Sequence, residues 1–366
     1  MPSSMKVLIV RLGALGDIVH AIPVAVALRR AYPDAQIDWV VSAKHREILD
    51  LVPVLNRRIV VNDRGAGAGG VSLLSAIRDL RRQRYDVAID LQGLMKSAAI
   101  ARLSGATRVL GFNAKYARES FATAFYTEQY DPGGEGMYAP SETRHVVDIN
   151  LGLLTLLGLT PERVAFGLRV TASPAVMQVI QQAGGRFALL NTGAAWPNKR
   201  WPAARLGALA VRLREQRGLA SIVLWGPGER ALADEVVSTA QGAAILAPQT
   251  TIADIAALAS AAAVMVSGDT GPTHIGSAVG TPLVGIYGPT RPERNGPLGA
   301  DDESVSRAAV VRRTPVRWRP TCSAKPCCHA HSYESAAPEV SSSVAGETSG
   351  DGCPGPRSFL KYARYT

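Results

Sequence analysis

The chain has 366 residues, of which 47% are hydrophobic, so it is long enough to bury a large core and to form two domains. Its 40 basic and 30 acidic residues give a net charge of +10, which favours an anionic partner. Only 6% of the residues are aromatic, and no basic stretch alternates with aromatic residues, which argues against nucleic-acid binding.

We expect no secretory leader, because the apolar run Val7–Val10 is short and is followed by Arg11. No apolar segment is long enough to predict a membrane span. The nearest, Ile255–Val266, is short and rich in alanine, which predicts a buried helix that leads into a strand. All four cysteines lie from Cys322 onward, so the body of the protein uses no disulfide, and a cytoplasmic protein is expected.

The first half of the chain alternates short apolar runs with helix-like stretches, which predicts a parallel sheet with helices on both faces. The strand-like runs are Val7–Val10, Ile37–Val41, Ile59–Val61, Val87–Asp90 and Arg108–Gly111. The helix-like stretches are Ile18–Ala31, Arg46–Leu51, Leu73–Arg84 and Lys96–Leu103. The loop Asp131–Pro140 follows, and His145–Leu157 is predicted as a helix that leads out of the first domain.

The same alternation begins again after Thr160 and Pro161. The strand-like runs are Phe187–Asn191, Ser221–Trp225, Ala244–Leu246, Ala263–Ser267 and Leu283–Tyr287. The helix-like runs are Ala203–Gln216, Glu229–Thr239, Ile252–Ala259 and Pro272–Val279. We therefore expect two doubly wound domains that face a cleft, residues 1–170 and 171–313, with ligands at the carboxyl ends of the strands. The tail, residues 314–366, has no apolar period and is expected to be largely disordered.

The first strand-to-helix turn, residues 13–16 (GALG), matches the glycine fingerprint of dinucleotide-binding proteins only in part. The third glycine is missing, and so is the Gly-Lys-Ser/Thr of a P-loop. Asp38 lies about where a ribose-binding carboxylate is expected, but inside a strand-like run, which favours coincidence. Asp17, in the first turn of the helix, either complements the helix dipole, worth about 0.3–1 kcal/mol, or has a functional role. Both interpretations are open from this turn alone.

Two turns in the second half place polar groups directly before a helix. Residues 191–202 (NTGAAWPNKRWP) present Thr192 and Lys199, and cations beside a helix N-terminus favour an anion site. Residues 226–228 (GPG) are followed by Glu229. Its carboxylate either accepts two ribose hydroxyls or begins a helix at the position that the dipole favours.

The turn that most favours a ligand is residues 268–271 (GDTG), which follows a buried strand-like run and precedes a helix. Its glycines and Thr270 expose backbone N–H groups at a helix N-terminus, which suits a diphosphate. His274 lies one helical turn further on, and residues 287–290 (YGPT) form another polar turn beside it. The first domain offers a carboxylate, and the second offers hydroxyls, amides and cations. This asymmetry predicts transfer of a group from a nucleotide donor in the second domain to an acceptor in the first.

Five collinear segments carry a resemblance to a known family: KVLIVRLGALGDIVHAIP, DLQGLMKSAAIARLSGATRVLGF, KYARESFATAFY, NTGAAWPNKRWP and SGDTGPTHIGSAVGTPLVGIYGPT. They resemble the lipopolysaccharide heptosyltransferases, which are family 9 glycosyltransferases, and most of all the heptosyltransferase I branch. The resemblance covers about residues 5–300.

The resemblance implies a GT-B fold of two Rossmann-like domains that face a cleft. It also implies an inverting glycosyltransferase that needs no metal or other cofactor. The implied reaction transfers heptose from an ADP-heptose donor to the Kdo sugar of a phosphorylated lipid A acceptor. The surplus of basic residues fits loose attachment to the anionic cytoplasmic face of the inner membrane, with no nucleic-acid partner.

By position, Asp17 resembles the catalytic base of the family. Lys199 resembles the lysine that binds the donor diphosphate and offsets the charge on the leaving ADP. Asp269 resembles the carboxylate that holds heptose hydroxyls. The other donor contacts that the resemblance implies are Thr192, Glu229, Thr270, Gly271 and His274. The acceptor contacts that it implies are Gly16, Gln92, Lys96 and Arg118.

Two features depart from the family pattern. Residues 13–15 lack the hydroxyl side chains that often precede the Gly-Asp of the first turn. Within the tail, residues 322–331 (CSAKPCCHAH) resemble the start of the cysteine segment of the family, but the expected amphipathic helix does not follow. A shifted reading frame after about Val305 would explain this, and so would true divergence. The cysteine spacing matches no zinc pattern, so we expect no metal site there.

Three other functions stay open from the sequence. One is a related transferase that uses another nucleotide sugar, and another is a catalytically inactive protein that binds a nucleotide sugar. The third is a nicotinamide-dependent oxidoreductase, which the missing third glycine of the first turn disfavours.

Overall fold

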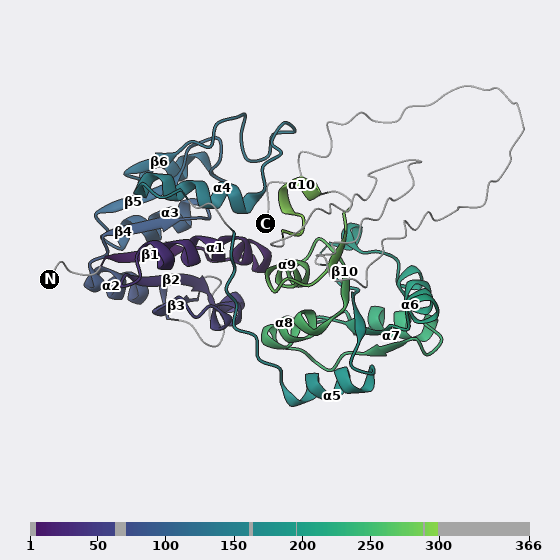
Figure 1. Cartoon of the computed structure of the whole chain (residues 1–366). Coiled ribbons are helices and arrows are strands. Elements are labelled where there is room, and N and C mark those ends of the chain that lie inside the picture. The colour runs from purple at the N-terminus through teal and green to yellow at the C-terminus, as the bar shows by residue number, and fades with distance from the viewer. Residues whose placement is uncertain (1–4, 63–70, 161–163, 195, 288–289, 299–366) are drawn as a thin grey trace, which may run out of the picture. The chain divides into compact units, whose positions relative to one another are not determined.

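The computed structural model describes residues 5–62, 71–160, 164–194, 196–287 and 290–298. The predictions for the tail, including a change of reading frame after about residue 305, fall outside these residues. The described part of the chain forms two parallel sheets with helices packed against them (Figure 1). No helix in this part is long and apolar enough to cross a membrane.

The first sheet has the strand order β3-β2-β1-β4-β5-β6, and all of its neighbouring strands are parallel. Its strands are β1 (Lys6–Val10), β2 (Gln36–Ser42), β3 (Arg57–Val61), β4 (Val87–Asp90), β5 (Arg108–Phe112) and β6 (Glu128–Tyr130). Its helical segments are α1 (Leu15–Ala31), η1 (Ala43–Leu51), α2 (Leu73–Gln83), α3 (Met95–Leu103), η2 (Ser120–Phe125), α4 (Val146–Gly152) and η3 (Leu153–Leu157). The five strands predicted in this half are confirmed.

Three details of the first half differ from the prediction. The stretch expected as a helix at Arg46–Leu51 is a 3₁₀ helix that begins earlier, at Ala43. The helix predicted for His145–Leu157 is an α-helix followed by a 3₁₀ segment, with His145 as its N-cap, where the imidazole accepts a hydrogen bond from the Val147 N–H. Strand β6 was not predicted, because it has three residues and polar side chains and is held by its pairing with β5.

The second sheet has the order β11-β10-β7-β8-β9 and is also parallel. Its strands are β7 (Phe187–Asn191), β8 (Ala220–Leu224), β9 (Ala244–Leu246), β10 (Val264–Gly268) and β11 (Leu283–Ile286). Its helical segments are α5 (Pro174–Gln182), η4 (Pro197–Lys199), α6 (Ala203–Arg217), α7 (Arg230–Thr239), α8 (Ile252–Ala261), α9 (Gly271–Ala278) and α10 (Pro292–Asn295). All five strands predicted in this half are confirmed.

Helix α5 was missed from the sequence, although its start carries a recognisable signal. Ser173 is the N-cap and its hydroxyl accepts a hydrogen bond from the Val176 N–H, while Pro174 occupies the first helical turn. The expected domain boundary near residue 170 falls in the segment between η3 and α5, and it stays a prediction.

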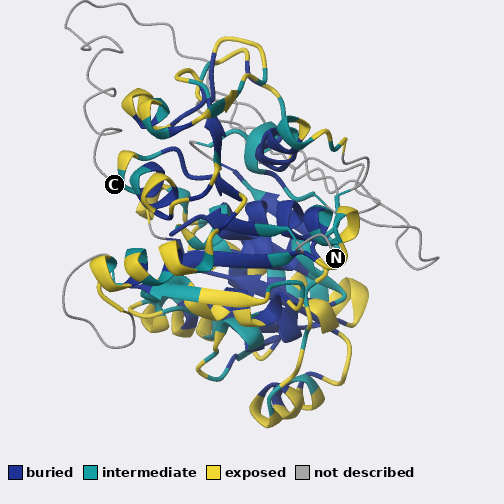
Figure 2. Ribbon diagram, turned by 90° about the vertical axis from the view of Figure 1, so that its left-hand side faces the viewer, coloured by how far each residue is buried: buried dark blue, intermediate teal, exposed yellow. Residues whose placement is uncertain are grey.

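The central strands are buried on both faces, as their unbroken apolar runs require, whereas β3, β6 and β9 are partly exposed. Residues 7–10 of β1 have no exposed surface, and β7 and β8 are buried along their whole length. Figure 2 shows the buried strands in dark blue and the outward helix faces in yellow. Because all strands in each sheet are parallel, the turns that leave their carboxyl ends gather along one edge of that sheet.

Helix α1 packs against α4 and also against α9, which follows β10 of the second sheet. One buried apolar cluster accordingly contains α1 residues together with Ile275 of α9. A glycine allows this close approach, since a Cβ on Gly16 would lie 2.4 Å from the His274 ring. The fold therefore brings the N-terminal turn of α1 next to α9.

Candidate active site

Asp17 lies in the first turn of α1, where two arginines hold one of its oxygens. Arg11 contacts Asp17 Oδ2 at 2.7 Å and Arg118 contacts the same oxygen at 2.6 Å. The Ala14 N–H adds a long hydrogen bond of 3.4 Å to it. Among the described residues, Asp17 Oδ1 accepts no hydrogen bond, and the side chain is 26% exposed. One oxygen is thus fixed, while the other is free to meet a ligand.

Burial by itself would raise the pKa of the Asp17 carboxyl, but the charges of Arg11 and Arg118 outweigh this and lower it well below its usual range. Arg11 is the first residue after β1 and is 5% exposed, and its guanidinium also donates a hydrogen bond to the Leu91 carbonyl oxygen. Arg118 follows β5 and was predicted to contact the acceptor. Asp17 is therefore ionised at neutral pH.

Lys199, Asp269 and His274 form the second part of the site. Lys199 Nζ is 2.6 Å from Asp269 Oδ2, and His274 Nε2 is 3.4 Å from Asp269 Oδ1. Burial of the Asp269 carboxyl would raise its pKa, but its contacts with His274 and Lys199 lower it below the usual range. Gly268 makes room for this arrangement, since a Cβ there would lie 2.8 Å from the Lys199 carbonyl oxygen.

Thr270 is the N-cap of α9, but its hydroxyl does not cap the helix. It accepts a hydrogen bond of 3.1 Å from the Asn191 amide, which also donates to Ser267 Oγ at 3.0 Å. The first N–H groups of α9 therefore receive no side-chain cap from Thr270, which suits an anion at the helix N-terminus. Gly271 begins this helix, where a Cβ would meet the Leu15 side chain at 2.6 Å.

Two further predicted donor contacts lie in neighbouring turns. Thr192 is buried, and its hydroxyl donates to the Leu224 carbonyl oxygen at 3.1 Å, which ties β7 to β8. Glu229 is the N-cap residue of α7, and its Oε2 accepts a hydrogen bond from the Gly226 N–H at 2.9 Å. The carboxylate of Glu229 covers Gly193, where a Cβ would lie 1.8 Å from Oε2. The geometry shows a turn-stabilising role for Glu229, and its contact with a ribose stays a prediction.

Of two other predicted acceptor contacts, Gln92 and Lys96, Gln92 has a hydrogen bond to the Asp17 turn. Gln92 is buried, and its Oε1 accepts a hydrogen bond from the Leu12 N–H at 2.7 Å, so it fixes the turn between β1 and α1. Lys96 lies in the first turn of α3, the helix that begins just after Gln92. Asp38 is fully buried in β2 and accepts a hydrogen bond from the Tyr85 hydroxyl at 2.6 Å. This agrees with the interpretation that its ribose-like spacing is a coincidence.

Three buried histidines lie between α1, α4 and α9. The ring of His20 is 4.2 Å from that of His274 and 5.4 Å from that of His145, measured between centroids. His145 Nδ1 accepts a hydrogen bond from a backbone N–H, so its Nε2 donates to the Gly296 carbonyl oxygen at 3.0 Å. Burial lowers the pKa of His145 to about 4 and also lowers that of His20, so both are neutral at pH 7.

In the part of the chain that the structure describes, no cluster of three or more histidine, cysteine, aspartate or glutamate side chains could hold a metal ion. The site instead combines a carboxylate from the first sheet with a lysine, a carboxylate and an open helix N-terminus from the second. Such a set can accept a proton on one side and bind an anion on the other.

Comparisons with known proteins agree with this arrangement. The sequence profile of glycosyltransferase family 9 (heptosyltransferase) matches residues 73–317. The chain is 33% identical to lipopolysaccharide heptosyltransferase 1 of Pseudomonas aeruginosa over 310 residues, which covers 81% of this chain and 82% of that protein. It is 28% identical to lipopolysaccharide heptosyltransferase 1 of Escherichia coli K12 over 312 residues, 83% of this chain and 94% of that protein. The structure is similar to that of the E. coli heptosyltransferase WaaC with ADP, with a TM-score of 0.68, 25% identity and coverage of 81% and 91%.

Proposed function

The chain belongs to glycosyltransferase family 9, the heptosyltransferases, and has their GT-B fold, and on this basis we propose the reaction that it catalyses. It transfers heptose from ADP-heptose to the Kdo sugar of a phosphorylated lipid A acceptor, with inversion at the anomeric carbon. The relatives from P. aeruginosa and E. coli are named lipopolysaccharide heptosyltransferase 1, which supports heptose transfer to lipopolysaccharide. The E. coli heptosyltransferase WaaC was solved with ADP, which supports an ADP-linked donor. The observation that carries the proposal is the Asp17 carboxylate, which is held through one oxygen beside the N-terminal turn of α9.

In the proposed mechanism, Asp17 is the general base. An acceptor hydroxyl attacks the anomeric carbon of the donor, and Oδ1 of Asp17 takes the hydroxyl proton as the new C–O bond forms. The bond between the anomeric carbon and the diphosphate oxygen breaks, and its electron pair leaves with ADP. The ion pairs of Oδ2 with Arg11 and Arg118 keep the carboxylate ionised and correctly oriented. Attack from the side opposite the leaving group inverts the anomeric centre.

Lys199 and the N-terminus of α9 offset the negative charge that grows on the departing ADP. Asp269 pairs with Lys199 at 2.6 Å, so a cation for the diphosphate and an acceptor for heptose hydroxyls lie side by side. Thr192, Glu229, Thr270, Gly271 and His274 are the further donor contacts in this proposal. Gly16, Gln92, Lys96 and Arg118 are those on the acceptor side.

The charge of Arg118 is expected to set the acid side of the pH profile. A positive charge this close lowers a carboxyl pKa by about 1–3 units, so Asp17 stays ionised, and active as a base, to low pH. Replacing Arg118 by Met raises the pKa of Asp17, and the acid limb of kcat/KM should therefore move to higher pH by about 1–3 units. The check is kcat/KM measured across the pH range in which the protein stays folded.

The control for this measurement is Arg58→Met, which removes an arginine paired with exposed Asp50 at 3.0 Å, away from Asp17. That variant should keep the wild-type profile. If the acid limb of kcat/KM in Arg118→Met coincides with the wild-type limb, Arg118 does not lower the pKa of Asp17.

We propose that the reaction needs no metal or other cofactor, because Lys199 and the α9 amides supply the positive charge that a cation would supply. Turnover is expected to be unchanged after dialysis against EDTA. The check is the rate of ADP release before dialysis, after dialysis and after Mg²⁺ is added back. A loss of activity that Mg²⁺ restores would contradict the proposal.

The proposed partners are a nucleotide-sugar donor, the phosphorylated Kdo-lipid A acceptor and the anionic cytoplasmic surface of the inner membrane. The net charge of +10 supports peripheral attachment to such a surface, since each basic residue near anionic lipid contributes about 1 kcal/mol. Nucleic acid is not among the proposed partners.

A donor series tests the proposal against its alternatives. Purified protein is given Kdo-lipid A with ADP-heptose, ADP-glucose or UDP-N-acetylglucosamine, and nucleotide release is measured. Release that requires both ADP-heptose and the acceptor is the expected result. Release from another sugar nucleotide would indicate the related transferase, and binding of ADP-heptose without release would indicate the inactive homologue.

A further inference from the structure

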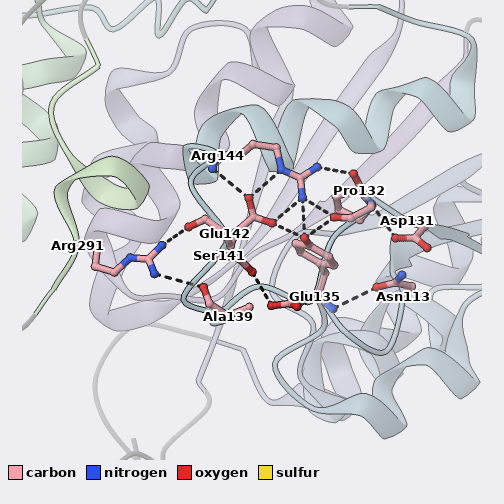
Figure 3. A network of polar contacts seen from close by, with 11 residues as sticks. Asn113, Asp131, Pro132, Glu135, Ala139, Ser141, Glu142, Arg144 and Arg291 are labelled. Carbon is pink, nitrogen blue, oxygen red and sulfur yellow. Dashed lines mark hydrogen bonds and ion pairs between the residues drawn. The ribbon is translucent and has the colours of Figure 1, made fainter.

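A second polar network gives the loop of residues 131–145 a defined shape (Figure 3). The Arg144 guanidinium donates hydrogen bonds to the carbonyl oxygens of Pro132 and Gly133 and to the Glu142 carboxylate. It also donates to the Tyr116 hydroxyl at 2.6 Å. Glu142 is 5% exposed, and its hydrogen bonds with Arg144 lower its pKa to about 2. The loop therefore has its own buried polar centre.

Arg291, which follows β11 of the second sheet, also binds the backbone of this loop. Its guanidinium donates to the carbonyl oxygens of Ala139 at 3.4 Å, Pro140 at 2.5 Å and Glu142. Figure 3 shows the Arg291 guanidinium turned toward the loop at Ala139 and Glu142. Three backbone acceptors on one fixed cation make a contact that depends on the fork geometry of arginine.

The loop of residues 131–145 and the segment of residues 291–296 meet at two more places. The Arg294 guanidinium lies over the ring of Tyr138, 4.7 Å from its centroid, and His145 Nε2 donates to the Gly296 carbonyl oxygen at 3.0 Å. The Met137 N–H donates to the Lys115 carbonyl oxygen at 3.2 Å, which fixes the loop to the segment that carries Arg118, the residue that holds Asp17, and the Tyr138 hydroxyl interacts electrostatically with Arg118. A continuous set of contacts thus runs from residues 291–296, through the loop, to the carboxylate.

We propose that Arg291 is a positioning residue for the transfer reaction, which rests on the function proposed above. Arg291 binds the backbone of residues 139–142 and so holds Tyr138 beside Arg118. Arg118 in turn keeps Asp17 oriented with its Oδ1 toward the acceptor hydroxyl. Arg291 touches no reacting atom. Its effect belongs to the chemical step, because small displacements of a reacting group lower the rate strongly.

The test compares Arg291→Met with a matched arginine. Arg29 makes the same type of contact, because its guanidinium donates hydrogen bonds to the carbonyl oxygens of Pro33, Ala35 and Val54. It lies at the far end of α1 from Asp17. Arg291→Met is expected to lower kcat by about tenfold or more while the Kd for ADP stays unchanged. Arg29→Met is expected to lower only the melting temperature. Arg291→Lys, which keeps the charge but not the fork, should recover part of kcat.

A second variant shows whether Arg291 acts through Tyr138. Tyr138→Phe removes the hydroxyl that interacts electrostatically with Arg118 and keeps the ring under Arg294, and the side chain is 63% exposed, so the variant should fold. Tyr138→Phe should lower kcat, and the double variant should be no slower than Arg291→Met alone. The proposal would be overturned if the two substitutions lowered kcat independently, so that their effects multiplied in the double variant. It would also be overturned if Arg291→Met kept the wild-type kcat.

Hydrogen–deuterium exchange separates this proposal from the proposed function. Faster exchange of the amides of residues 137–144 is expected in Arg291→Met and not in Arg29→Met. Wild-type protein without transferase activity would refute the function, and the exchange result would still decide whether Arg291 holds the loop. Unchanged exchange in Arg291→Met would overturn the positioning role.

Discussion

Replacing Asp17 by Asn is expected to lower kcat for sugar transfer by about a hundred- to ten-thousand-fold while the Kd for ADP stays near the wild-type value. Asn keeps the shape of the side chain and can still accept hydrogen bonds from Arg11 and Arg118, but its amide cannot take a proton from the acceptor hydroxyl. Asp17→Ala should show the same loss of transfer with donor binding retained. Steady-state kinetics and calorimetry with ADP measure the two quantities separately.

Asp254 provides a matched control for a purely structural role of Asp17. Both carboxylates occupy the third position of a helix and accept a hydrogen bond from the N-cap N–H, but Asp254 lies in α8 and accepts it from Thr251. Asp254→Asn should lower the melting temperature and leave kcat unchanged. If Asp17→Asn behaves in the same way, Asp17 only complements the helix dipole, which is worth about 0.3–1 kcal/mol.

Replacing Lys199 by Met is expected to weaken ADP binding by about ten- to a hundredfold and to lower kcat as well, since a charged hydrogen bond contributes about 1.5–3 kcal/mol. The ammonium group is the cation that pairs with Asp269 beside the N-terminus of α9, where the diphosphate is proposed to bind. Its charge becomes more valuable as ADP leaves, so the rate should fall in addition to the affinity. Calorimetry with ADP and steady-state kinetics measure the two effects.

Two controls separate this role from a loss of folding. Lys6→Met removes an ammonium that donates to the Gln83 carbonyl oxygen at 3.0 Å, at the amino end of β1, and should keep the wild-type affinity. The double variant Lys199→Met/Asp269→Asn leaves no unpaired carboxylate, so it should fold well and still bind ADP poorly. Wild-type affinity for ADP in Lys199→Met would remove the lysine from the donor site.

Most strands of both sheets were predictable because parallel strands that are buried on both faces leave unbroken apolar runs. Such runs start and end within a few residues of β1, β4 and β7. Elements held by contacts remote in sequence left weaker signals. Strand β6 has no apolar run and exists through its pairing with β5, and the 3₁₀ form of η1 is not encoded in its periodicity.

Parts of the candidate site follow from the sequence for a simple reason. Asp17, Lys199 and Asp269 lie in turns that leave the carboxyl ends of strands, where ligands of parallel sheets bind. Their partners could not be found in this way, because the pairing of Arg118 with Asp17 joins residues 101 positions apart. Arg11 did leave a signal, since it is a charged residue directly after a buried strand.

The most direct test of this account is the mass of the acceptor after reaction. Kdo-lipid A is incubated with ADP-heptose and the wild-type protein, and in parallel with Asp17→Asn, and the lipid is then examined by mass spectrometry. The account predicts that the wild-type protein adds the mass of one heptose residue with release of ADP, and that Asp17→Asn adds almost none. An acceptor of unchanged mass with the folded wild-type protein, or equal addition by both proteins, would contradict it.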